Sequence, residues 1–173
     1  MKAREKTKGV GMKKILVAVD FSKNTGKVVE QATILAKGLK AKTWIVHVTS
    51  DQIQTAAYAS ASFYDPAATF IVAPAGDVEM ARDLCAEEYK QEHQALLQLS
   101  KKLREAGVDA QAMLLKGNAA ELILEQAENL DIDMIVIGSH GHGLLRKMLL
   151  GSVTETVLHK AFCNVLIVPP PME

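Results

Sequence analysis

The fold of this chain is decided by the stretch Ile132–Thr154, which reads IDMIVIGSHGHGLLRKMLLGSVT. It starts as an apolar run typical of a buried strand and breaks at a glycine, and a second glycine followed by a hydroxyl residue opens a helix. The first break leaves backbone N–H groups at the carboxyl end of a strand. The second leaves them at a helix N-terminus, where the helix dipole favours an anion. Two such turns, joined by a segment that contains Arg146 and Lys147, predict a cradle for a polyphosphate.

The composition predicts one domain in a reducing compartment. The length of 173 residues suits a single domain, and the 49% of apolar residues is enough for a full core. Twenty basic residues balance twenty acidic ones, so no net charge attracts nucleic acid or an anionic membrane. No apolar run approaches the roughly 18–20 residues of a membrane-spanning helix. Cys85 and Cys163 lie far apart, which argues against a disulfide scaffold and fits the cytoplasm.

Strand and helix patterns alternate along the chain. Short β-branched runs predict strands buried on both faces, and apolar residues at helical spacing predict the helices between them. The alternation predicts an α/β fold, an open parallel sheet of five strands with helices on both faces. The predicted strands are Lys14–Asp20, Thr43–Val48, Val108–Leu115, Met134–Ile137 and Asn164–Val168. The first predicted helix follows Ser22 or Asn24 and has its apolar positions between Val28 and Leu39, and the other predicted helices are Asp77–Ala106, Asn118–Asn129 and Ser152–Ala161.

The expected ligand site follows from this architecture. In an open parallel sheet, ligands bind outside the carboxyl ends of the strands, at the point where the strand order reverses. Asp20 ends the first predicted strand and Gly138 follows the fourth, and these are the two most distinctive loop starts in the chain. The fold pattern and the glycine-rich stretch therefore predict the same site.

Three helix N-termini carry capping patterns. Ser22 or Asn24 is predicted to cap the first helix, and Asn118 with Glu121 resembles a capping box for the third. Ser152–Glu155 is a capping box for the last helix, and this role requires no ligand.

His47 and the charged residues Glu87–His93 are predicted to have structural roles, and His140 and His142 are not predicted to bind a metal ion. His47 is predicted to be a strand residue that faces a helix, since a buried polar side chain usually finds a local partner. His140 and His142 lie two residues apart, which is not the spacing of metal ligands on a helix. The charged run Glu87–His93 is predicted to be a solvated helix face, with His93 exposed.

Two segments have no single interpretation. Residues 50–76 are rich in alanine, serine and tyrosine and show no firm period, so a lid, a partner surface and a poorly ordered insert all fit. Residues 1–12 are basic but lack the apolar core of a signal peptide. They are interpreted as a flexible leader, with a cloning remnant or an alternative start before Met12 as equal alternatives.

The glycine spacing Gly138-x2-Gly141-x9-Gly151-Ser152 resembles the G-2x-G-9x-G-[S/T] motif of the ATP-binding branch of the universal stress protein family. Other segments that resemble the family stand in the family's order: KKILVAVDFS at 13–22, HV at 47–48, KGN at 116–118 and NVLIVPP at 164–170. The resemblance implies a Rossmann-like, adenine nucleotide alpha hydrolase-like sheet with strand order 3-2-1-4-5. It also implies a domain over residues 13–171 that contains 50–76 as an insert.

The resemblance further implies bound ATP, with Mg²⁺ or Mn²⁺ on its phosphates. Asp20 is then expected near the ribose or the metal-bound phosphates, as an indirect metal contact. Ala18, Val19 and Val48 are expected to contact the adenine, and Ile137 and Gly138 to line the base and ribose. Backbone N–H and hydroxyl groups are expected to hold the phosphates at His140, Gly141, Gly151, Ser152, Val153 and Thr154. The glycines also have a purely structural interpretation, as residues that permit tight turns.

A homodimer is the last implication of the resemblance. In it, the final strands of two chains pair antiparallel. An unpaired apolar edge strand is a liability for a monomer, so physical reasoning favours the same arrangement. The residues of this predicted interface are Asn164, Val165, Leu166, Ile167 and Val168.

Three functions are compatible with the sequence. The first is a cytoplasmic ATP-binding stress-response protein that acts as a nucleotide-dependent switch read by a protein partner. The second is a nucleotide-independent dimeric interaction module. The third is a slow ATPase or nucleotidyl-transfer enzyme, although the chain contains no GxxxxGK[ST] motif. Its AVDFSKNTG loop also lacks the His-x-Gly-His and Ser-Gly-Gly motifs of enzymes with this architecture.

Overall fold

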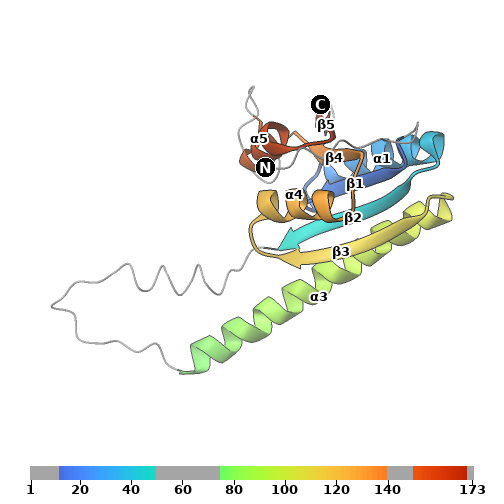
Figure 1. Ribbon diagram of the computed structural model, residues 1–173. Helices are drawn as coiled ribbons and strands as arrows, with labels where there is room; N and C mark the ends of the chain where they lie inside the picture. The colour runs from blue at the N-terminus through green and yellow to red at the C-terminus, as the bar shows by residue number, and fades with distance from the viewer. Residues whose placement is uncertain (1–11, 50–74, 140–149, 171–173) are drawn as a thin grey trace.

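The computed structural model describes residues 12–49, 75–139 and 150–170, with side chains of the long helix from residue 86 onward. Strands and helices alternate as predicted (Figure 1). The elements in chain order are β1 (Lys14–Val19), α1 (Thr25–Leu39), β2 (Lys42–Thr49), α3 (Ala75–Glu105), β3 (Ala110–Lys116), α4 (Ala119–Asn129), β4 (Met134–Gly138), α5 (Ser152–Lys160) and β5 (Asn164–Val168).

The five strands form one parallel sheet in the order β3-β2-β1-β4-β5, which confirms the predicted topology. β1 lies at the centre, and its Val17 is in register with Ile45 of β2 and Val136 of β4. The chain moves outward from β1 to β2 and β3 on one side, and then returns to β4 and β5 on the other. The strand order therefore reverses between β1 and β4, which is where a ligand is expected in an open parallel sheet.

Helices cover both faces of the sheet and bury two apolar clusters. Successive strand side chains point to opposite faces, so Ile15 and Val17 pack with residues of α1 and α3, whereas Leu16 and Ala18 pack with residues of α4 and α5. This two-sided burial explains why β1 is apolar at nearly every position. Among the described residues, no helix is both long and apolar enough to cross a membrane.

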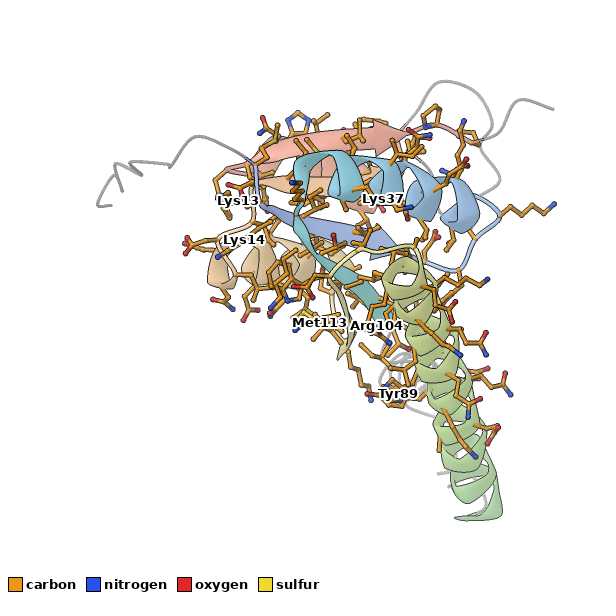
Figure 2. All side chains as sticks on the ribbon, turned by 90° about the vertical axis from the view of Figure 1, so that its right-hand side faces the viewer. Lys13, Lys14, Lys37, Tyr89, Arg104 and Met113 are labelled. Atoms are coloured by element: carbon orange, nitrogen blue, oxygen red, sulfur yellow. The ribbon has the colours of Figure 1, made fainter. Side chains whose placement is uncertain are left out.

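α3 lies beside β3 at one edge of the sheet and extends well beyond it (Figures 1 and 2). Its last turns are fixed to the start of β3, because the Arg104 guanidinium donates hydrogen bonds to Ser100 Oγ at 3.2 Å and to the Ala110 carbonyl at 3.0 Å. Tyr89, farther from this anchor, is 45% exposed (Figure 2). The helix begins two residues before the predicted Asp77.

The capping predictions have mixed outcomes. The Asn118 side chain accepts a hydrogen bond from the Glu121 N–H at 3.2 Å, so this cap is confirmed. The prediction for the first helix is wrong, because Asn24 occupies the N-cap position without a side-chain capping bond. Instead its Nδ2 donates to the Val168 carbonyl at the end of β5, at 3.0 Å. Ser22 Oγ contacts the Asn24 N–H at 3.4 Å, outside the helix itself.

We expect Asn24→Ala to lower the free energy of unfolding by about 1–2 kcal/mol, because it removes a buried donor to Val168. Asn24→Asp should cost more, because it replaces that donor with a carboxylate oxygen facing a carbonyl oxygen. Urea unfolding measures both effects, with the exposed neighbour Lys23→Ala as control. An alanine variant as stable as this control would show that the contact contributes nothing.

Candidate functional site

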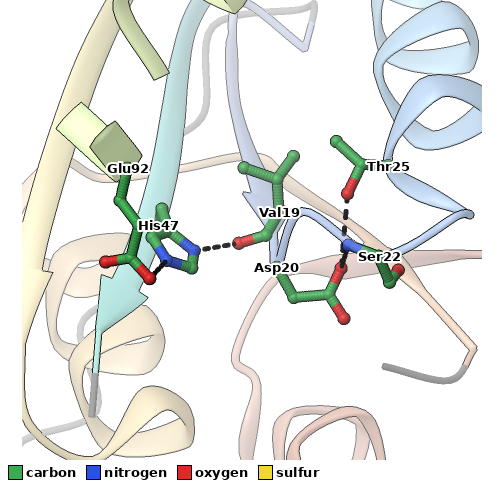
Figure 3. Close-up of polar contacts among 6 residues, drawn as sticks. All are labelled: Val19, Asp20, Ser22, Thr25, His47 and Glu92. Atoms are coloured by element: carbon green, nitrogen blue, oxygen red, sulfur yellow. Dashed lines mark hydrogen bonds and ion pairs between the residues drawn. The ribbon is translucent and has the colours of Figure 1, made fainter. Parts of the chain in front are cut away.

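The turn after β1 presents Asp20 at the carboxyl end of the central strand. Asp20 Oδ1 accepts hydrogen bonds from the Ser22 N–H at 3.0 Å and from Thr25 Oγ1 at 3.3 Å (Figure 3). Phe21, between Asp20 and Ser22 in the chain, has a φ of 56°, a left-handed conformation that is uncommon for residues other than glycine. The carboxylate is thus fixed beside the first turn of α1 by a strained, internally hydrogen-bonded turn.

The turn after β4 is fastened to both β5 and α5. The Ser139 N–H donates to the Val168 carbonyl at 2.9 Å, and the Gly151 N–H donates to the Ser139 carbonyl at 2.9 Å. The buried Thr154 hydroxyl donates to the Gly138 carbonyl at 2.7 Å. These bonds place the N-terminus of α5 against the carboxyl end of β4.

The capping box predicted for α5 is wrong in its residue assignment. Gly151 is the N-cap, Ser152 is the first helical residue, and no side chain caps the helix. The N–H groups of Ser152, Val153 and Thr154 have no carbonyl within the helix to bind, as in the first turn of any α-helix. The N-terminus of α5 therefore offers backbone donors and the positive end of a helix dipole beside the end of β4.

The residues predicted to contact adenine gather at the same end of the sheet. Ala18 of β1 and Ile137 of β4 are register partners, and both are buried. Val48 of β2 follows His47, the register partner of Val19, and packs partly buried at the edge of the cluster under α4 and α5. The structure thus brings Ala18, Val19, Asp20, Val48, Ile137, Gly138, Gly151, Ser152, Val153 and Thr154 to the carboxyl ends of β1, β2 and β4 and the start of α5.

Several predicted features lie outside the described residues. They are His140 and Gly141, the basic pair Arg146 and Lys147, the leader up to residue 11 and residues 50–74 of the insert. Within the described part of the chain, no group of three or more histidine, cysteine, aspartate or glutamate side chains is arranged to hold a metal ion.

A polar contact behind the Asp20 turn was only partly anticipated. His47 faces helix α3, as predicted, and its Nε2 lies 3.4 Å from Glu92 Oε1. Its Nδ1 lies 2.8 Å from the Val19 carbonyl oxygen (Figure 3). Glu92 is half-buried, so the prediction of a solvated face over Glu87–His93 is wrong at this residue. The sequence pattern contains no signal that pairs Glu92 with a residue 45 positions earlier.

Sequence comparisons identify relatives along nearly the whole chain. The model of the universal stress protein family matches residues 11–169. Universal stress protein YxiE of Bacillus subtilis is 33% identical over 156 residues, which cover 90% of this chain and 97% of YxiE. Universal stress protein A homolog 2 of Coxiella burnetii is 34% identical over 159 residues, which cover 90% and 94%.

Solved structures share the fold. The structure of MJ0577, a universal stress protein of Methanocaldococcus jannaschii, aligns with a TM-score of 0.70 and 26% identity over 95% of this chain and 100% of that one. A universal stress protein in complex with cAMP aligns with a TM-score of 0.60 and 20% identity, over 93% of this chain and 99% of that one. The universal stress protein of Archaeoglobus fulgidus in complex with dAMP aligns with a TM-score of 0.54 and 21% identity, over 90% of this chain and 96% of that one. The chain belongs to the universal stress protein family.

Proposed function

We propose that this protein binds ATP, or a related adenine nucleotide, at the carboxyl ends of β1 and β4. The observation that carries the proposal is the convergence of three features at the reversal of strand order. They are the Asp20 turn, the end of β4 at Gly138, and the uncapped N-terminus of α5. Two family members of the same fold were solved with the adenine nucleotides cAMP and dAMP, which supports this class of ligand.

The proposed pose follows the chemistry of each part of the site. The adenine lies against the apolar ends of the strands, at Ala18, Val19 and Val48. Ile137 and Gly138 line the base and ribose. Asp20 approaches the ribose or a Mg²⁺ or Mn²⁺ ion on the phosphates. The phosphates receive backbone N–H and hydroxyl groups from the α5 turn and the segment before it, at His140, Gly141, Gly151, Ser152, Val153 and Thr154.

The proposed role is that of a cytoplasmic switch in the stress response. A nucleotide bound in the cradle changes the surface that a partner protein meets, and the difference between its affinities for two forms of the protein couples the two events. Among the residues proposed for the site, only His140 has the side chain of a general base besides Asp20, and none is a lysine or arginine that could clamp a transition state. We therefore propose at most slow hydrolysis.

The second candidate function is a nucleotide-independent interaction module that dimerises through β5. The observation in its favour is that β5 forms an edge of the sheet, pairing with β4 alone among the described strands. Asn164 is exposed there, and Val165, Leu166 and Ile167 are half-buried. We propose the homodimer for both candidate functions, since an unpaired apolar edge strand is a liability in either case.

The first test identifies what the purified protein holds. Freshly purified protein is denatured, and the released small molecules are separated by chromatography and identified by mass. We expect ATP or ADP at close to one molecule per chain. Protein that releases no nucleotide, and that gives no calorimetric signal with added ATP and Mg²⁺ or Mn²⁺, would overturn the switch and leave the interaction module.

A further inference from the structure

His47 connects the long helix α3 to the backbone of the proposed nucleotide turn. The residue sits near the end of β2 and is only 6% exposed. Its two ring nitrogens face in different directions, Nδ1 toward the Val19 carbonyl of β1 and Nε2 toward Glu92 of α3 (Figure 3). Val19 is the residue immediately before Asp20, so this histidine contacts the backbone from which the turn begins.

The two contacts of the ring differ in kind. A carbonyl oxygen only accepts hydrogen bonds, so Nδ1 must carry the proton and donate to Val19. Nε2 lies within ion-pair distance of Glu92 but, within the described part of the chain, forms no hydrogen bond, and neither does Glu92 Oε2. The bond to Val19 is therefore the one directional contact of the ring, whereas the approach of Nε2 to Glu92 is an ion pair only when both ring nitrogens carry a proton.

The same ring supports the strained residue of the turn. The Phe21 ring packs against the imidazole, with centroids 4.5 Å apart and planes tilted by 58°. Phe21 has the left-handed φ of 56°, a conformation that persists only where its surroundings enforce it. Asp20 points the other way, toward Ser22 and Thr25 (Figure 3). His47 thus contacts the residues on either side of Asp20.

We propose that His47 is a positioning residue for the nucleotide site, which holds the Val19–Phe21 turn in its binding conformation through the bond from Nδ1. This role rests on the nucleotide binding proposed above. It differs from that of a merely structural core histidine, whose loss lowers stability but leaves the affinity of the folded protein unchanged. The role predicts that affinity depends on one ring nitrogen and not on the other.

Two amide variants separate the two nitrogens. The side-chain amide nitrogen of asparagine takes roughly the position of Nδ1, so His47→Asn keeps a donor to Val19 and loses the contact with Glu92. Glutamine reaches roughly the position of Nε2, so His47→Gln keeps a donor toward Glu92 and loses the bond to Val19. Both substitutions replace a buried ring with a neutral amide, and each variant serves as the control for the other.

We expect the Kd for Mg²⁺–ATP to rise about tenfold in His47→Gln and to stay within about threefold of the wild type in His47→Asn, the range expected for one buried hydrogen bond. Calorimetry is run well below both melting temperatures. Equal affinities in the two variants, beside a wild type that binds ATP, would overturn the positioning role. A wild type that does not bind ATP would instead overturn the proposed function and, with it, the use assigned to His47.

A measurement on nucleotide-free protein examines the turn itself. The Ser22 N–H is bonded to Asp20 Oδ1, so its hydrogen exchange reports whether the turn is closed. We expect faster exchange in His47→Gln and wild-type exchange in His47→Asn. The ¹⁵N shifts of the wild-type ring should show a protonated Nδ1. An unprotonated Nδ1, or the same Ser22 exchange rate in both variants, contradicts the inference whether or not ATP binds.

Discussion

Gly151→Val is expected to weaken ATP binding by at least about a hundredfold, or about 2.7 kcal/mol. Gly151 is the N-cap of α5, and its N–H is already bonded to the Ser139 carbonyl. Its φ of −61° and ψ of 149° are accessible to any residue, so valine introduces no backbone strain. The added branched side chain instead stands at the helix N-terminus, where the proposed phosphates need close approach to the backbone.

The control for this variant is Gly38→Val. Gly38 lies in the last turn of α1, at the opposite end of the sheet from the site, and a Cβ there meets no atom within 4 Å. Gly151→Val loses a favourable N-cap residue and should cost about 1 kcal/mol of stability, whereas Gly38→Val replaces a poor helix former at an exposed position and should cost none. Calorimetric titration with Mg²⁺–ATP should show wild-type affinity for Gly38→Val. Unaltered affinity in Gly151→Val would place the phosphates elsewhere.

The course of the chain through the fold was predictable because the sheet is buried on both faces. β1 reads KILVAV without alternation, which only a central strand covered on both sides tolerates. The interruptions at Asp20 and Gly138 then had to fall at carboxyl ends of parallel strands. The alternation of strands with helices along the chain predicts the parallel sheet. The strand order 3-2-1-4-5 was implied by the family resemblance, and the structure confirms it.

The contacts that fix the turns were less predictable, since local patterns do not name distant partners. Asn24 has the sequence context of a helix cap, yet its side chain bonds to Val168, 144 residues away. Thr154 falls inside an apparent capping box, yet its hydroxyl bonds to Gly138 at the end of β4. In both cases the side chain donates to a carbonyl at the end of a strand instead of capping a helix, and the partner depends on how the strands come together.

The backbone conformation of Phe21 could not be predicted from the sequence, for a different reason. Positive φ is ordinarily predicted from glycine or asparagine, and nothing in Asp20-Phe21-Ser22 indicates it. The conformation is held by long-range packing against His47, a residue of another strand. Sequence reasoning located His47 correctly against a helix, but the partners on its two sides depend on how β1, β2 and α3 come together.

Leu166→Lys is expected to convert the proposed homodimer into a monomer, with an association at least about a hundredfold weaker by sedimentation equilibrium. Edge strands expose unpaired backbone groups, and two β5 strands related by a twofold axis satisfy these groups mutually. The surface beside β5 is apolar as well, since Leu158 and Phe162 are 43% and 52% exposed. An inserted ammonium group opposes the burial of this edge, because a charge loses its hydration there.

Leu114→Lys is the matched control, because Leu114 lies on β3, the other edge of the sheet. Leu114 and Leu166 are both half-buried and pack against the same apolar cluster, so lysine should harm the monomer's core similarly at either site. A difference in assembly between the two variants therefore reports on the edge and not on general destabilisation. Dimeric Leu166→Lys with monomeric Leu114→Lys would move the interface to β3. If both variants remain dimers, the two chains do not pair through an edge strand. The exposed side chains of α5 would then be the surface that a second copy covers.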